Sequence, residues 1–389
     1  MRANPEHAPL PILASFVVAA CGLGLYNGCR MVVSFSALQL GAGPATLGML
    51  NALCGVLPII FGLAIGRLID RVGVRAPVMG SLLIALLGML APFAWPSYAA
   101  LALASLGTGL AFMTGIIGSN KAVAALTSPA RRAGQLGWLS ATSSIGGSLT
   151  LVALGFAVDH FGHRASFALT ALLPALALVA LAAFGRGLPA PAADAPRHRG
   201  GSAMELLRDP QIRMMILLSA VVPVTNDTFS FLIPIIGSGL GWSASITGVV
   251  LGSALGAAVV SRMLLPWTTR HMGPWTLLGV SFIAIACCYL VLPLIERPSL
   301  MIGLALLIGL GGGVAPPVLS ALIYGASPAG RQGEVIGLRS SLQSVFASGT
   351  PLAVGALSAL IGLAPIVCAM GAAFAWAAQV SFRERIRSR

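Results

Sequence analysis

The sequence consists of apolar runs of about 20 residues separated by short polar segments, and a run of that length spans a bilayer as an α-helix. Only 8% of the residues are charged, against about 25% in soluble domains, so the chain cannot cover a water-facing surface. The predicted fold class is therefore an all-α membrane protein. We expect twelve transmembrane helices in two sets of six, at 12–38, 47–69, 76–95, 98–124, 135–158 and 165–184, then at 212–237, 245–267, 275–295, 299–324, 333–360 and 363–381.

The basic residues predict which side of the membrane faces the cytosol. If both termini are cytosolic, 18 of the 23 lysine and arginine residues lie in inner segments, and only Arg164 and Arg297 lie in outer ones. Cytoplasmic segments of membrane proteins carry an excess of these residues, so the distribution predicts cytosolic termini. The net charge of +13 then reflects topology, because no basic domain is present that could hold a nucleic acid.

Two further features limit the domain organisation and the chemistry. All six cysteines lie in apolar segments, which predicts neither disulfides nor a zinc site. The longest polar stretch, 185–210, is rich in proline, alanine and charge, and we expect it to be a cytosolic linker. It divides the chain into an N-terminal six-helix bundle, 1–184, and a C-terminal six-helix bundle, 211–389.

The two halves of the chain repeat one another at a shift of 200 residues. The matches are individually weak but follow one another in order: Leu40-Gly41 with Leu240-Gly241, Gly48 with Gly248, and Gly109-Leu110 with Gly309-Leu310. Two six-helix repeats of the same orientation imply a pseudo-twofold axis along the membrane normal, with a cavity between the halves that can open to either side.

The loop between the second and third predicted helices carries a motif of fixed spacing. It reads Gly66-Arg67-Leu68-Ile69-Asp70-Arg71-Val72-Gly73-Val74-Arg75 and fits the pattern G-x-x-x-D-R-x-G-x-R at every fixed position. With this loop and its twelve predicted helices, the chain resembles the major facilitator superfamily over its full length. A second family-like stretch, Asp159 to Arg164, follows the fifth helix. The resemblance implies a secondary transporter of the cell inner membrane that works by alternating access, as a monomer and without a cofactor or metal.

The loop motif has the chemistry of a gate. Gly66 lets two helices approach closely, and Asp70 can accept hydrogen bonds from the positive end of a facing helix. We expect Arg71 and Arg75 at the cytosolic surface, with Gly73 completing the motif. The resemblance implies that these residues clamp the second helix against the eleventh when the inner side is shut. The alternative is a solvated basic loop that serves only topology.

Charged residues within hydrocarbon cost about 2.5 to 3.5 kcal/mol each, so each one needs a specific explanation. We expect substrate contacts from three helices, the first, seventh and eleventh: Tyr26, Asn27 and Arg30; Asn226 and Asp227; Arg339 and Gln343. The resemblance implies that the first and seventh helices line the central cavity.

Each of these charges also has a simpler interpretation. Arg30 and Asp227 could neutralise one another, and Arg339 could pack against the loop clamp. Lys121, the only lysine, could extend to the cytosolic interface without any further role.

The predicted function is a secondary active transporter for a small solute. An arginine in the first helix favours an organic anion or zwitterion, and Asp227 could carry a coupling proton if its apolar surroundings raise its pKa. The alternative is a proton-coupled multidrug or toxic-compound efflux antiporter, although the arginine of the fourth helix and the Gly-Pro of the fifth that mark that group are missing. No HExxH, no GxSxG and no clustered carboxylates occur, so we do not expect an enzyme.

Overall fold

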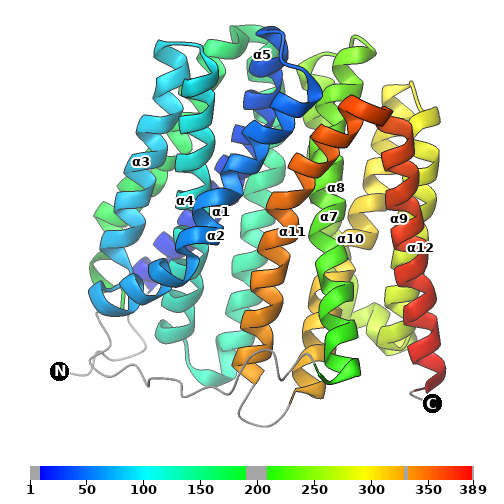
Figure 1. Cartoon of the computed structure of the whole chain (residues 1–389). Coiled ribbons are helices and arrows are strands. Elements are labelled where there is room, and N and C mark those ends of the chain that lie inside the picture. The colour runs from blue at the N-terminus through cyan, green and yellow to red at the C-terminus, as the bar shows by residue number, and fades with distance from the viewer. Residues whose placement is uncertain (1–8, 190–207, 328–331, 388–389) are drawn as a thin grey trace. The chain divides into compact units, whose positions relative to one another are not determined.

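The computed structural model describes residues 9–189, 208–327 and 332–387, and it is built from helices (Figure 1). Most of the predicted linker, 190–207, lies outside the described residues. Two short 3-10 helices, Gly185–Gly187 and Leu292–Leu294, follow α5 and α9. The α-helices are α1 Pro9–Gln39, α2 Pro44–Val72, α3 Arg75–Ala94, α4 Tyr98–Leu126, α5 Pro129–Phe184, α7 Pro210–Gly239, α8 Ala244–His271, α9 Pro274–Val291, α10 Pro298–Ala326, α11 Gln332–Ile361 and α12 Leu363–Arg387.

Ten helices in the described part of the chain are long and apolar enough to cross a membrane. The prediction of twelve differs from this count at two places. Helix α5 has 56 residues and covers two of the predicted helices, because its helical hydrogen bonding continues past a kink at Gly162, where φ is 79°. Helix α11 covers the predicted helix 333–360, but many of its side chains lie outside the described residues, and Gly349–Ile361 is the apolar stretch of it that is described.

The contacts between residues divide the chain into two compact units. The first comprises Met1–Pro196 together with Ser243–Gly252, so it holds α1 to α5 and the start of α8. The second comprises Arg197–Trp242 and Ser253–Arg389, with α7, the rest of α8, and α9 to α12. Helix α8 is therefore shared between the units.

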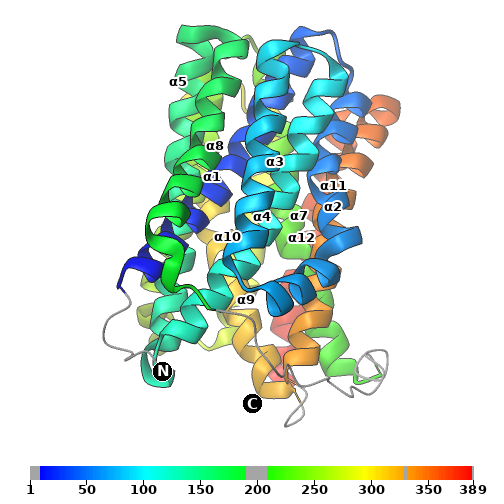
Figure 2. The ribbon, with the colours of Figure 1, turned by 90° about the vertical axis from the view of Figure 1, so that its left-hand side faces the viewer.

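In the first unit, α1 packs against α5 and α4, and α3 packs against α4 and α5. Figures 1 and 2 show α3 and α4 side by side. Small residues allow these approaches: a Cβ built on Gly146 of α5 would lie 2.8 Å from the carbonyl oxygen of Ala20 in α1. Helices in lipid associate through such close van der Waals packing rather than through exclusion of water.

In the second unit, α9 packs against α12 and α10, and α7 packs against α10 and α11. The rings of Tyr289 in α9 and Phe374 in α12 are stacked with centroids 5.7 Å apart, and both side chains are fully buried. The Tyr289 hydroxyl donates to the carbonyl of Thr225 at 2.7 Å, which ties α9 to α7. This cluster therefore joins α7, α9 and α12 through buried contacts.

The sequence repeat reappears as a repeated packing contact. A Cβ built on Gly109 of α4 would lie 1.8 Å from the Cys54 carbonyl oxygen of α2, and one built on Gly309 of α10 would lie 2.0 Å from the Ala254 carbonyl oxygen of α8. Gly109 and Gly309 are related by the shift of 200, and so are their partners Cys54 and Ala254. Four of the five glycines with positive φ in the described chain obey the same shift: Gly41 with Gly241 and Gly162 with Gly362.

We predict that Gly109→Ala and Gly309→Ala each lower the Tm of the purified protein, because the added Cβ would collide with a backbone carbonyl. Overpacking of this kind costs about 1 to 3 kcal/mol. Gly80→Ala in α3 is the matched control, since a Cβ there meets open space and alanine is the better helix former. A Tm for the first two variants as high as that of the control would contradict the prediction.

Candidate functional site

Arg30 lies in the middle of the first unit and is only 4% exposed. Its Nε donates to the Asn51 Oδ1 of α2 at 3.3 Å, and its guanidinium carbon lies 5.4 Å from the centroid of the Tyr26 ring. The Tyr26 ring in turn stacks on Phe112 of α4, with centroids 4.5 Å apart. Three helices therefore fix the orientation of a buried, planar cation.

Asn51 is the residue that organises this cluster. Its Nδ2 donates to the Ser34 hydroxyl and to the Leu47 carbonyl, both at 3.0 Å, so its Oδ1 is oriented towards Arg30. Ser34 donates to the carbonyl of Arg30 itself at 2.7 Å. The sequence prediction included Tyr26, Asn27 and Arg30 but missed Asn51, although an asparagine in an otherwise apolar helix was a visible signal. Asn27 follows Tyr26 in α1 and is half-buried.

The candidate residues of the second unit form a different environment. Asp227 is 8% exposed and interacts electrostatically with Tyr289 of α9, whereas its neighbour Asn226 is exposed. The Asn226 Oδ1 lies 3.6 Å from the position of a Cβ on Gly312, so this amide lies against the glycine-rich part of α10. Asp227 and Asn226 thus lie on different sides of α7.

Arg339 and Gln343 bind neighbouring helices of the same unit. The Arg339 Nη1 donates to the Ser320 hydroxyl of α10 at 2.5 Å, and the Gln343 Nε2 donates to the Ser219 carbonyl of α7 at 2.9 Å. These two contacts join α11 to α10 and α7 one helical turn apart. The structure therefore gives both side chains a role in holding α11.

The loop Gly66 to Arg75 connects the ends of three elements in the first unit. Asp70 pairs with Lys121 of α4 at 2.5 Å, and Lys121 also donates to the Ile69 carbonyl at 3.3 Å. The Arg75 Nη2 donates to the Ala182 carbonyl near the end of α5 at 3.2 Å. Lys121 is therefore an ion-pair partner of the motif rather than a cation that only extends to the interface.

Two other members of the motif behave differently from each other. Gly73 adopts a φ of 87°, a value that favours glycine, and lets the chain turn directly from α2 into α3. A Cβ built on Gly66, however, meets open space among the described residues. The close helix approach at Gly66 stays a prediction, because many side chains of α11 lie outside the described residues. Arg71, at the end of α2, is exposed.

A second loop repeats this arrangement within α5. Its sequence from Gly155 to Arg164 has glycine, aspartate, glycine and arginine at the same spacing as Gly66 to Arg75. Gly162 has a φ of 79° and a ψ of 173°, close to the 87° and 173° of Gly73. The Arg164 Nη2 donates to the carbonyls of Phe93 and Ala94 at the end of α3, at 2.9 and 3.0 Å.

Asp159 of this second loop caps the start of α8. Its carboxylate accepts from the backbone N–H of Ala244 at 2.9 Å, from that of Ser245 at 2.8 Å, and from the Ser245 hydroxyl. A Cβ built on Gly155 would lie 2.6 Å from the Ala244 carbonyl oxygen, so α5 and α8 touch at this point. The aspartate thus does at α8 what we expected Asp70 to do at a facing helix. We call Gly155, Asp159, Gly162 and Arg164 the α5 latch.

We predict that Asp159→Ala frees the start of α8, because two backbone N–H groups lose a charged acceptor. Charge-assisted hydrogen bonds contribute about 1.5 to 3 kcal/mol each. Hydrogen–deuterium exchange measured by mass spectrometry should rise within Ser243–Gly252. Asp209→Ala is the control, since Asp209 caps α7 through the N–H groups of Gln211 and Ile212. Its effect should stay within the start of α7, and exchange at α8 that is equally fast in both variants would contradict the role of Asp159.

The structural comparisons find the same fold in solved structures. A POT family transporter in complex with a thioalcohol-conjugated peptide has a TM-score of 0.78 at 14% identity, covering 97% of this chain and 96% of its own. A mutant of the nucleoside transporter NupG gives 0.79 at 11% identity, covering 95% and 99%. A POT family transporter in complex with 5-aminolevulinic acid gives 0.75 at 14% identity, covering 95% and 94%. At these identities the likeness concerns the fold alone.

The sequence comparisons give the family. No curated protein matches the chain. The family model described as Major Facilitator Superfamily matches residues 12–351. This range includes the loops 66–75 and 155–164 and all of the candidate residues named above. The chain therefore belongs to the major facilitator superfamily.

Proposed function

We propose that this protein is a proton-coupled secondary active transporter of the cell inner membrane that moves an organic anion or zwitterion by alternating access. The observation that carries the proposal is the fixed guanidinium of Arg30. A permanent cation in a transmembrane helix is expensive, and membrane proteins place such groups on solute or ion pathways. The proposal explains why a positive charge is present in this transmembrane helix.

The way Arg30 is held favours an anionic ligand. Its Nε bond to Asn51 uses one of the five N–H donors of the guanidinium and sets the plane in which the others lie. A guanidinium of fixed plane suits the two oxygens of a carboxylate or phosphate, which it can bind by two parallel hydrogen bonds. Tyr26 and Asn27 on the same helix would add a ring face and an amide to such a site.

The similar structures suggest which compounds to test. POT family transporters have been solved with a thioalcohol-conjugated peptide, with 5-aminolevulinic acid and with sulfate. These ligands carry carboxylate or sulfate groups. A thermal-shift screen of the purified protein should therefore include organic acids, amino acids, short peptides and 5-aminolevulinic acid, with nucleosides and cationic drugs as the competing classes. Stabilisation by cationic drugs alone would reverse the proposal in favour of efflux.

We further propose that the two loops act as opposite latches of the transport cycle. In the conformation described, Asp159 is bound to the start of α8 and Asp70 is bound to Lys121. Opening of the outer side would release Asp159, and closure of the inner side would move Asp70 from Lys121 to the start of α11. Asp70 would then exchange one set of donors for another, whereas Asp159 would give up the backbone N–H groups at the start of α8.

For the substrate site, we predict that Arg30→Lys weakens the binding of the best anionic compound by about 1 to 3 kcal/mol, because the charge is kept and the planar fork is lost. Arg30→Ala should weaken it further. Isothermal titration calorimetry of the purified variants measures both values, and a cationic compound provides the control. Binding of the anion by Arg30→Ala at the affinity of the natural protein would remove Arg30 from the site.

The alternative in which Arg30 and Asp227 merely neutralise one another has a separate signature. In that case the double variant Arg30→Ala with Asp227→Ala should recover stability and binding better than either single variant, because no buried charge lacks a counter-charge. A substrate role for Arg30 predicts that the double variant binds no better than Arg30→Ala. The double-mutant cycle distinguishes the two interpretations.

For coupling, we predict that Asp227→Asn abolishes accumulation of the solute against its gradient and leaves exchange at equilibrium. An amide cannot take up and release a proton, whereas a buried carboxylate beside Tyr289 can. The measurement is uptake into vesicles with an imposed pH gradient, with Asp209→Asn as the control for a carboxylate at a helix end. Concentrative uptake by Asp227→Asn would show that the proton is carried elsewhere.

A further inference from the structure

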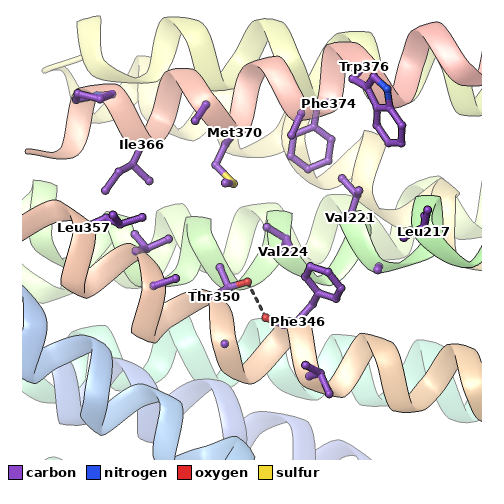
Figure 3. Close-up of a pocket in the computed structure, with 18 of the residues that line it drawn as sticks. Leu217, Val221, Val224, Phe346, Thr350, Leu357, Ile366, Met370, Phe374 and Trp376 are labelled. Carbon is purple, nitrogen blue, oxygen red and sulfur yellow. Dashed lines mark hydrogen bonds between the residues drawn. The ribbon is translucent and has the colours of Figure 1, made fainter. Parts of the chain in front are cut away.

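The second unit contains an apolar cavity of about 660 Å³ that the transport proposal does not use. Its walls come from α7, α11 and α12, and Figure 3 shows side chains of α11 and α12 pointing towards one another across it, with α7 behind. The floor is buried, with Val354, Ile366 and Phe374 at most 4% exposed. The rim is open, since Phe346, Leu357 and Trp376 are 41 to 48% exposed. The cavity is thus a groove with a packed floor and an open side.

The groove exists because the two helices beside it have their main partners elsewhere. Helix α11 packs chiefly on α7, and α12 packs chiefly on α9. The residues that face the space from α11 and α12 include Gly349, Ala353, Ala369 and Ala373, which are too small to fill it. Protein side chains therefore leave the space between α11 and α12 open.

Neither water nor a polar solute suits this space. Among the described residues that line it, Thr350 is the one with a side-chain hydroxyl, and its Oγ1 donates to the Phe346 carbonyl of its own helix at 2.6 Å. A bound water needs two to four polar partners, and an anion needs donors. The lining offers hydrocarbon and aromatic surface, which favours an alkyl chain.

The dimensions of the groove fit one lipid tail. Along α12 the lining runs from Pro365 to Trp376, which is about 17 Å at 1.5 Å per residue. One leaflet of a bilayer contributes about 15 Å of hydrocarbon. The end of the groove at Ile361 and Pro365 adjoins the turn between α11 and α12 at Gly362, and no charged residue lines that end. A lipid could therefore enter there with its headgroup outside the groove.

We propose that the groove between α11 and α12 is a binding site for one acyl chain of a membrane phospholipid. The tail lies along Phe346, Met370 and Trp376 and adds to the sparse contact between the two helices. Recognition is by hydrocarbon packing, so the site does not select a headgroup. Because α11 also carries Arg339 and Gln343, the bound chain supports the helix that holds these residues against α10 and α7. The proposal does not depend on the identity of the transported solute.

A pair of glycine variants tests the site. Gly349 lines the groove and Gly303 of α10 does not, yet a Cβ at either position meets open space among the described residues, so the two positions are matched in local room for a side chain. Native mass spectrometry of the full chain, purified in detergent from phosphatidylethanolamine-containing membranes, should show one retained phospholipid. Gly349→Leu should lose that adduct because its side chain occupies the groove, and Gly303→Leu should keep it. Equal retention by the two variants would overturn the proposal.

Fluorescence provides a second measurement that does not depend on retention in detergent. Trp376 is made the only tryptophan by changing the other five to phenylalanine, and the protein is reconstituted with phosphatidylcholine brominated on its acyl chains. Bromine in the groove should quench Trp376, and Gly349→Leu should reduce the quenching relative to Gly303→Leu. Unchanged quenching in Gly349→Leu would overturn the proposal. Displacement of the brominated chain by a transported solute would also overturn it, since the groove would then belong to the transport pathway.

Discussion

Close contact between helix backbones is the interaction on which this structure depends. In a bilayer, apolar side chains gain nothing by leaving the lipid for the protein, so helices associate where small residues let their backbones touch. The contacts of Gly109 with Cys54 and of Gly309 with Ala254 show this at equivalent points of the two units. Their recurrence at a shift of 200 residues indicates that the same packing solution was used twice. The aromatic cluster around Tyr289 and the groove beside α12 both lie in the second unit.

The buried cations of the helices share a second kind of interaction. Each buried cation described above is oriented by a neutral oxygen from another helix: Arg30 by Asn51, and Arg339 by Ser320. In each case a polar side chain of a neighbouring helix accepts a hydrogen bond from the guanidinium and fixes the direction in which its plane lies.

Sequence reasoning succeeded where the signal is periodic or local. The lengths of the apolar runs located the helices, and the ordered glycines located the repeat. The motif from Gly66 to Arg75 identified the family, because its spacing is specific. The motif from Gly155 to Arg164 has the same spacing, so its glycine and aspartate could have been interpreted in the same way. What the sequence lacked was the partner of Asp159, because the start of α8 is about 85 residues away and is brought near only by packing.

The same limit explains the other omissions. The sequence of an apolar run does not predict that Asn51 faces Arg30 or that Lys121 pairs with Asp70, because each pairing depends on how one helix is rotated against another. The groove between α11 and α12 is still less visible, since a cavity is defined by which contacts are not made. The close approach expected at Gly66 was inferred from the loop motif alone, and a Cβ on that glycine meets open space among the described residues.

The shared helix α8 has a consequence for how the protein is made. The first unit includes Ser243–Gly252, which the ribosome delivers after the linker and the whole of α7. The N-terminal bundle therefore reaches the membrane before the segment that Asp159 caps, and that packs on Gly155, has been synthesised. The N-terminal bundle can reach this conformation only after Ser243–Gly252 has been synthesised. A chain truncated after the linker would lack that segment. The two bundles are repeats in sequence, but they are not independent steps in assembly.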